Sequence, residues 1–286
     1  MIEEISFLIA LVGSSVAAVW DLKTTEIPDE IPHAMMIVGI ALAALRSFLE
    51  WNYMHILASL LFGCSFLAFG FALYFFGQWG GGDAKLLAAV AFLLPTTPKF
   101  FSKELILPFP LSYLLNLLYV GAGYMILYAF VIALMNKKVI TAFKKDVKAS
   151  SNFLLLGVAT IFFTFLFANW YFSSIVMLDA TYAFWYAGLA ASLFVVLWFV
   201  WKFVKTVEDV GFKKRIPVSK LKVGDVLVQS KQWEGLTAEE VRKIKKSGKK
   251  YVVIKEGVRF GLAFPLALLF TLYFGDGILF FVRYFI

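Results

Sequence analysis

Two aspartates of this sequence stand where apolar segments give way to polar residues. Asp21 follows a long apolar run, and Asp83 follows three glycines and precedes another apolar run. A carboxylate near hydrocarbon costs free energy, so a residue in such a position is a candidate for function. Two neighbouring carboxyl groups can hydrolyse a peptide bond, because the ionised group accepts a proton from water while the protonated group polarises the carbonyl. The pair therefore predicts an aspartyl protease whose site lies at a membrane boundary.

The residues around Asp83 suit a site that admits a peptide. Gly80, Gly81 and Gly82 precede it directly, and their lack of side chains would let an extended chain approach the carboxylate. Lys85 follows two residues later. We expect Lys85 to mark the membrane boundary by snorkelling, with charge balance for the pair and a contact to a helix end as alternatives.

Each aspartate also has an ordinary structural explanation. Asp83 precedes Ala-Lys-Leu-Leu, as a helix N-cap would, and its carboxylate could bind free backbone amides. Asp21 could be an interfacial charge that ends a helix, and residues 27–29, Ile-Pro-Asp, suit a turn into the next helix. Taken singly these explanations are the simpler ones, so the catalytic hypothesis depends on the pair.

The composition is that of an integral membrane protein. Of 286 residues, 61% are hydrophobic, 18% are aromatic and only 16% are charged. The start, Met-Ile-Glu-Glu, lacks the basic residues of a secretory signal, and no small-residue cleavage site follows, so we expect the first helix to be retained. The single Cys64 excludes an internal disulfide and a cysteine-based zinc cluster. No metal or organic cofactor is expected.

Apolar runs predict an all-α polytopic membrane protein with about eight transmembrane helices. The expected segments are 2–20, 32–49, 54–76, 84–98, 109–135, 152–172, 180–204 and 260–282. The fourth segment is barely long enough before Pro95 and Pro98 interrupt it, and a re-entrant segment would have the same pattern.

The distribution of basic residues predicts the orientation. With the N-terminus outside, the basic loop 137–148 and most other lysines and arginines lie in the cytoplasm. Of the 27 lysines and arginines, those then left outside are Arg46, Lys99, Lys103 and Arg283. This arrangement predicts a multi-pass protein of the cytoplasmic membrane with its active site at the cytoplasmic face. Because topology accounts for the net charge of +8, no nucleic acid partner is expected.

Residues 205–258 differ in kind, because charges of both signs mix there and turn residues recur. We expect a small α+β cytoplasmic insert between a transmembrane protease core, 1–204, and a C-terminal transmembrane helix within 259–286. Residues 225–228 and 251–254 predict short strands. Residues 237–240 form a capping box that opens a basic helix through Lys246, whose charged face suits water or anionic headgroups.

The two motifs together resemble the type IV prepilin peptidases and the archaeal preflagellin peptidases. Asp21 followed by Ile-Pro-Asp, and Gly-x-Gly-Asp-x-Lys at 80–85, match the motifs of that family over residues 10–95. The resemblance implies that Asp21 and Asp83 are the catalytic pair and that the glycines are conformationally permissive positions. It also implies that Lys85 occupies the family's basic position.

The resemblance further implies a substrate: a prepilin or preflagellin precursor with a short basic leader before an apolar helix, cut at the cytoplasmic boundary. Lys23 falls in the basic region that follows the family's first aspartate. Glu26, Asp29 and Glu30 would suit the leader's lysines and arginines, or they are solvated acids of a turn. The cysteine-rich zinc region of bacterial members has no counterpart in this sequence, so methyl transfer is not expected. An archaeal source is expected instead.

Two other functions remain open. Gly-x-Gly-Asp also occurs in presenilin-like proteases, but their Tyr-Asp and Pro-Ala-Leu motifs differ from the Trp-Asp at 20–21 and the Pro-Leu-Ala at 265–267 of this chain. The non-enzymatic alternative is a transporter that binds a proton or cation at Asp21 and Asp83. Neither His33 nor His55 belongs to a metalloprotease or serine protease motif.

One more acid lies within an apolar segment. Asp276 falls late in the last expected helix, which begins near the cytoplasm. It should therefore lie toward the opposite membrane face from Asp21 and Asp83. Headgroup solvation or a structural hydrogen bond would account for it, and we expect no catalytic role.

Overall fold

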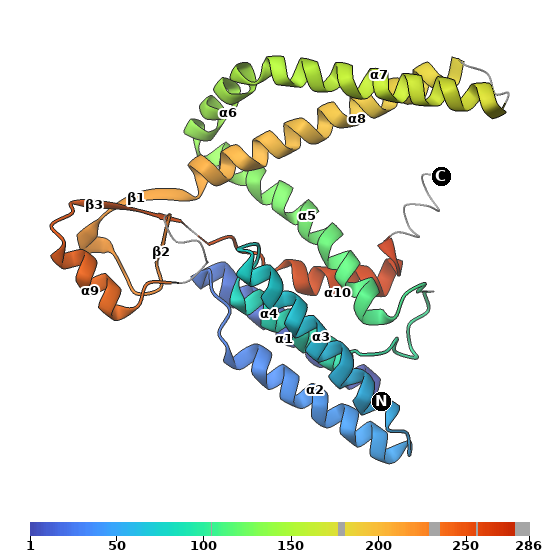
Figure 1. The fold of residues 1–286 in the computed structure, drawn as a ribbon. Helices are drawn as coiled ribbons and strands as arrows, with labels where there is room; N and C mark the ends of the chain where they lie inside the picture. The colour runs from blue at the N-terminus through green and yellow to red at the C-terminus, as the bar shows by residue number, and fades with distance from the viewer. Residues whose placement is uncertain (104, 177–180, 229–234, 256, 278–286) are drawn as a thin grey trace. The chain divides into compact units, whose positions relative to one another are not determined.

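The computed structural model describes residues 1–103, 105–176, 181–228, 235–255 and 257–277 (Figure 1). The chain forms two compact units. The first comprises Met1–Met125 and Lys214–Ile286, and the second comprises Ile126–Lys213. Helix α5 runs from one unit into the other. The division into 1–204, 205–258 and 259–286 remains a prediction.

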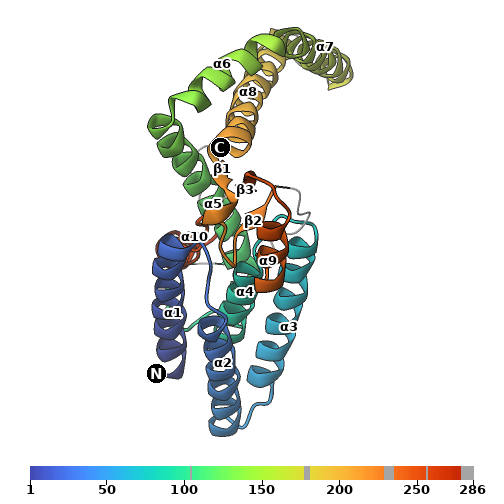
Figure 2. The same cartoon turned by 90° about the vertical axis from the view of Figure 1, so that its left-hand side faces the viewer.

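In the first unit, four helices from the N-terminal part of the chain pack together. They are α1 (Ile2–Thr24), α2 (Glu30–Leu49), α3 (Met54–Phe75) and α4 (Gly81–Leu93). Helix α4 packs against each of the other three, and α10 (Ala263–Phe274) packs against α1 (Figure 2). This packing brings the ends of α1 and α4, which carry Asp21 and Asp83, into one bundle.

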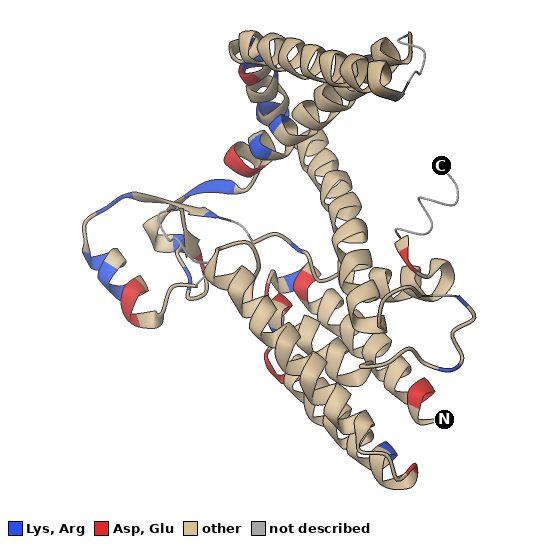
Figure 3. Cartoon of the chain, turned by 45° about the vertical axis from the view of Figure 1, so that its right-hand side comes forward, with Lys and Arg blue, Asp and Glu red and all other residues tan. Residues whose placement is uncertain are grey.

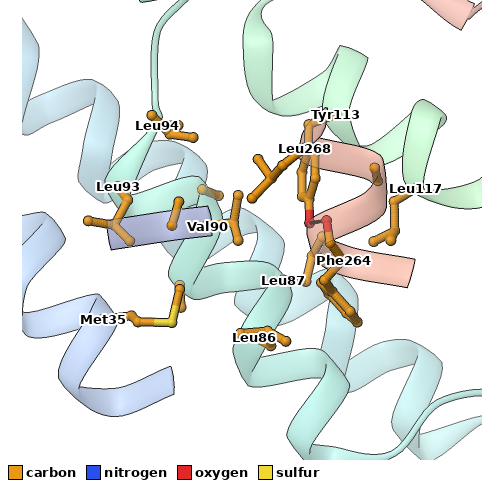
Figure 4. Packing of buried hydrophobic residues seen from close by; sticks show 14 of the residues in the cluster. Met35, Leu86, Leu87, Val90, Leu93, Leu94, Tyr113, Leu117, Phe264 and Leu268 are labelled. Carbon is orange, nitrogen blue, oxygen red and sulfur yellow. Dashed lines mark hydrogen bonds between the residues drawn. The ribbon is translucent and has the colours of Figure 1, made fainter. Parts of the chain in front are cut away.

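Helix α4 is the centre of this bundle. Every residue from Leu86 to Leu93 is buried, as expected for a helix that is apolar on all sides and enclosed by others. Figure 4 shows side chains of α4 against Tyr113 of α5 (Phe109–Met135) and Phe264 of α10. The hydroxyl of Tyr113 donates to the carbonyl of Phe264 over 3.3 Å. The packing holds the start of α4 in place.

The predicted class, a polytopic membrane protein with a small α+β insert, is confirmed. Six helices in the described ranges are long and apolar enough to cross a membrane. They are α1, α2, α3, α5, α7 (Ser151–Val176) and α8 (Thr181–Thr206). These helices are largely free of charge along their length, and Figure 3 shows Lys, Arg, Asp and Glu mainly near helix ends and in the insert.

The fourth and eighth expected segments form shorter helices. The expected segment 84–98 gives α4, which ends at Leu93, before Pro95. Its 13 residues rise about 20 Å, against roughly 30 Å of hydrocarbon. The expected segment 260–282 gives α10, which ends at Phe274, and residues 278–282 lie outside the described part of the chain.

The second unit consists of the end of α5, then α6 (Lys137–Ala149), α7, α8 and a π-helical turn, Val207–Gly211. The basic segment 137–148, expected as a loop between two membrane helices, does connect α5 to α7, but it folds as helix α6. The Asn136 side chain caps this helix by accepting from the Lys138 N–H, and Val139 is buried. Helices α7 and α8 pack along each other, and Lys202 of α8 forms an ion pair with Asp146 of α6.

The described part of the insert contains a three-stranded sheet, helix α9 (Ala238–Lys246) and a short 3-10 helix, Val218–Lys220. Its strands are β1 (Lys213–Pro217), β2 (Val226–Leu227) and β3 (Tyr251–Lys255), in the order β1-β3-β2. Strand β2 is antiparallel to β3. The predicted strands within 225–228 and 251–254 are confirmed, as is the capping box of α9 (Ala238–Lys246). Strand β1 was not predicted, because Lys-Lys-Arg-Ile-Pro lacks an alternating apolar pattern.

Candidate active site

Asp21 lies inside the last turns of α1, which continues to Thr24 rather than ending at Trp20 as expected. Thr25 then ends the helix in a left-handed conformation, with a φ of 63°. The Asp21 side chain is buried, with 4% of its surface exposed. Its Oδ2 accepts a hydrogen bond of 2.7 Å from the backbone N–H of Gly261. A buried carboxylate is thus held by a residue that precedes α10.

Asp83 is the third residue of α4, and the N-cap is Gly80. The expectation that Asp83 itself is the N-cap is therefore wrong. Its Oδ2 reaches back and accepts from the Gly80 N–H over 3.2 Å, as the acid of a capping box does. This bond satisfies one helix-end donor and fixes the carboxylate at the start of α4.

The two aspartates line the same cavity, which has a volume of about 710 Å³. They lie close enough for the negative charge of Asp21 to act on the carboxyl of Asp83. Among the other predicted site residues, the cavity wall includes Lys23, Glu26, Gly80, Gly81 and Gly82. The insert contributes Asp225, Val226, Ile254 and Lys255. The cavity is large enough to admit a peptide segment.

Three predicted site residues lie elsewhere. The Lys85 ammonium forms an ion pair of 2.6 Å with Asp29. Lys85 was expected to snorkel at the membrane boundary. Instead its ammonium is paired with Asp29, which lies in the turn after α1. Glu30 is exposed and, like Lys85 and Asp29, is not among the described residues that line the cavity. Of the three acids proposed to meet a basic leader, Glu26 alone is in the described wall.

The glycines before Asp83 allow close packing within the chain. A Cβ at Gly82 would lie 2.8 Å from the Cβ of Ile27, so the Ile-Pro-Asp turn can approach α4 only because Gly82 has no side chain. A Cβ at Gly80 would lie 3.1 Å from Oδ2 of Asp83. The expected role of these glycines in admitting a peptide remains a prediction, beside this role in joining the two motifs.

Sequence reasoning did not place the segment 257–261 at the site. Besides Gly261, it contains Arg259, whose positive charge acts on Asp21. It also contains Phe260, whose ring lies 5.9 Å from the ring of Trp79, the residue before Gly80. No spacing rule links residues so far apart in the chain. The local signal for a close backbone contact was a pair of glycines, at 257 and 261. They flank Arg259 just before an apolar run.

Asp276 is buried and accepts a hydrogen bond from the backbone N–H of Ile106. It is not among the described residues of the cavity wall. A structural hydrogen bond was expected for this acid, and the contact with Ile106 is one. Within the described ranges, no three His, Cys, Asp or Glu side chains are grouped as metal ligands.

Comparison with known proteins finds a family model that is similar to part of the chain. Residues 8–136 match the type IV leader peptidase family. The prepilin peptidase EppA of Methanothermobacter thermautotrophicus is 27% identical over 147 residues, which cover 48% of this chain and 38% of that protein. The preflagellin peptidase of Methanocaldococcus jannaschii is 31% identical over 117 residues, covering 40% and 46%.

A third relative, the preflagellin peptidase of Methanococcus voltae, is 30% identical over 92 residues, which cover 32% of this chain and 39% of that protein. The chain thus spans less than half the length of each of these relatives. The stretch that matches the family contains Asp21 and Asp83 but neither the insert nor Gly261.

Proposed function

We propose that this chain, whose residues 8–136 match the type IV leader peptidase family, is a membrane aspartyl endopeptidase. Its substrates are precursors of the prepilin or preflagellin kind, from which it removes a short basic leader. The observation that carries the proposal is that Asp21 and Asp83 line one cavity and interact through their charges. The names of the relatives support the kind of precursor.

The two carboxyl groups supply the chemistry of peptide hydrolysis. The ionised aspartate takes a proton from water as the water oxygen attacks the scissile carbonyl carbon. The protonated aspartate donates its proton to the carbonyl oxygen. The tetrahedral intermediate then collapses and the C–N bond breaks. The aspartate that took the proton from water gives it to the leaving amine, and the other aspartate regains a proton from a hydroxyl of the intermediate as the new carboxyl group forms. No other catalytic group is needed for these steps of peptide hydrolysis.

The cavity wall offers acids that can bind a basic leader, and its position indicates the membrane face on which the site lies. Glu26 places an exposed carboxylate in the same wall as the aspartates. The insert, which carries many of the lysines and arginines, forms another part of the wall. The bias of basic residues favours a cytoplasmic position for this end of the bundle, with the N-terminus outside the cytoplasmic membrane.

The test is cleavage of a tagged precursor that has a basic leader and an apolar helix. We expect a cut at the leader boundary, located by mass spectrometry, with the full chain in detergent or membranes. Asp21→Asn and Asp83→Asn should each lower kcat on the order of 10³-fold or more. Asp276→Asn, a matched change at a buried acid outside the described cavity wall, should retain cleavage. Cleavage that survives both of the first two changes would refute the proposal.

A further inference from the structure

The segment from Gly257 to Gly261, called the return segment here, leads from the insert to α10 and contacts both parts of the site. The N–H of Gly261 donates to Oδ2 of Asp21 over 2.7 Å. The ring of Phe260 lies 5.9 Å from that of Trp79, which directly precedes the glycines before Asp83. One short segment thus touches the end of α1 and the approach to α4.

The return segment is itself held at several points. The hydroxyl of Tyr124 on α5 donates to the carbonyl of Arg259 over 2.7 Å. A Cβ at Gly257 would lie 3.3 Å from the carbonyl oxygen of Thr25, so this glycine packs on the end of α1. A Cβ at Gly261 would lie 3.0 Å from Oδ2 of Asp21. A side chain at position 261 would therefore press on the Asp21 carboxylate.

The surroundings of the two carboxyl groups differ. Asp21 accepts the short bond from Gly261 and feels the positive charge of Arg259. Asp83 accepts a longer bond, of 3.2 Å, from Gly80. Repulsion between the two carboxylates acts on both of them, so it does not distinguish them. A shorter hydrogen bond and a nearby cation favour the ionised form of Asp21.

Other charged groups near the pair do not reverse this difference. The remaining charged residues in the described cavity wall are Lys23, Glu26, Asp225 and Lys255, two cations and two acids. Helix α10, which packs against α1, has no charged residue. On α2 and α4, which also pack against α1, the charged or titratable groups besides Asp83 are Glu30, His33, Arg46 and Lys85. Arg46 is paired with Glu3 and Glu50, and Lys85 is paired with Asp29.

We propose that the return segment positions Asp21 as the ionised base of the pair and leaves Asp83 as the proton donor. This inference rests on the proposed function and assigns one role to each aspartate. Asp21 takes the proton from water, and Asp83 gives its proton to the carbonyl oxygen of the scissile bond. Gly261 and Arg259 are positioning residues, because they act through Asp21.

The first test reads the protonation of each aspartate without any cleavage. A hydrophobic carbodiimide reacts with protonated carboxyl groups, and mass spectrometry of peptides then reports the labelling of Asp21 and Asp83 in the full chain. We expect Asp21 to lose reactivity at a lower pH than Asp83 as the pH is raised. The reverse order would overturn the inference. Since no substrate is used, this result is separate from any failure of the proposed function.

The second test uses the pH dependence of cleavage. Arg259→Gln removes a cation beside Asp21, so the acidic limb of the rate profile should move up by about one pH unit, and Arg259→Lys should restore it. Lys249→Gln, which removes an exposed cation of the insert, should leave the profile unchanged. An acidic limb that does not move in Arg259→Gln would overturn the inference.

The third test addresses the hydrogen bond from Gly261. Gly261→Ala should displace the Asp21 carboxylate and lower kcat by about 10²-fold, with little change in KM. The control is Gly123→Ala on α5, where a Cβ would meet nothing within 4 Å, and it should keep the wild-type kcat. A wild-type kcat in Gly261→Ala would overturn the assignment of a positioning role.

Discussion

At the scale of single residues, Asp21 and Asp83 each accept one backbone N–H and share one cavity. A pair of this kind titrates as a unit, because the charge of one group opposes ionisation of the other. The active form is the one with a single proton. Its population is limited at low pH by protonation of the base and at high pH by loss of the proton from the donor.

The first prediction is therefore a bell-shaped dependence of kcat/KM on pH. The rate should fall at the acidic side, where both carboxyl groups are protonated, and at the alkaline side, where both are ionised. Initial rates of precursor cleavage across the pH range provide the measurement. Asp276→Asn should keep both limbs, and a profile with no acidic limb would be inconsistent with an aspartate base.

A second prediction at this scale concerns Glu26. Its carboxylate lines the cavity, whereas Glu30 is exposed and outside the described wall. Glu26→Gln should raise KM for a precursor with a basic leader by about tenfold while kcat changes little, because an exposed charge contributes mainly to binding. Glu30→Gln is the matched control and should behave as wild type. Equal effects of the two changes would exclude a specific role for Glu26.

At the scale of elements, the insert depends on local hydrogen bonds and a small core. Leu221, Leu236 and Val241 form that core, and α9 begins at the capping box of Thr237 and Glu240. Bonds from the backbone and side chain of Thr237 hold the pKa of Glu240 below its ordinary value. Their contribution to stability is present above the unfolded pKa and is lost as the pH falls through the folded pKa.

We predict that α9 frays first as the pH falls below the ordinary glutamate pKa of 4.5. Hydrogen exchange of the peptide 237–246, corrected for the intrinsic rate at each pH, would show this as a loss of protection. In Glu240→Gln the charge is absent at every pH, so the pH dependence should disappear. If the variant keeps the full pH dependence, another group is responsible for it.

At the scale of the whole molecule, the helices impose a topology on the site. The turn that carries Glu26 connects α1 to α2, and the turn that carries Trp51 connects α2 to α3. A spanning α2 places these two turns on opposite faces of the membrane. The insert lines the same cavity as Glu26, so it lies on the Glu26 side.

This topology predicts how introduced cysteines react in intact cells. In a Cys64→Ser background, Trp51→Cys should react with a membrane-impermeant thiol reagent added outside. Lys249→Cys in the insert should react only after the membrane is permeabilised. Both positions are exposed, so access and not burial decides the result. Labelling of Lys249→Cys from outside would reverse the proposed orientation.

The sequence alone determined the features that depend on neighbours along the chain. Hydropathy identified the apolar helices, and the residues at 237–240 identified the start of α9, because these signals are local. Only the tertiary structure showed that Gly261 binds Asp21, that Lys85 pairs with Asp29 and that Gly82 packs on Ile27. These contacts join residues that are distant in the chain, and helix packing decides which of them meet. The aspartates could therefore be identified from motifs, whereas the groups that surround them could not.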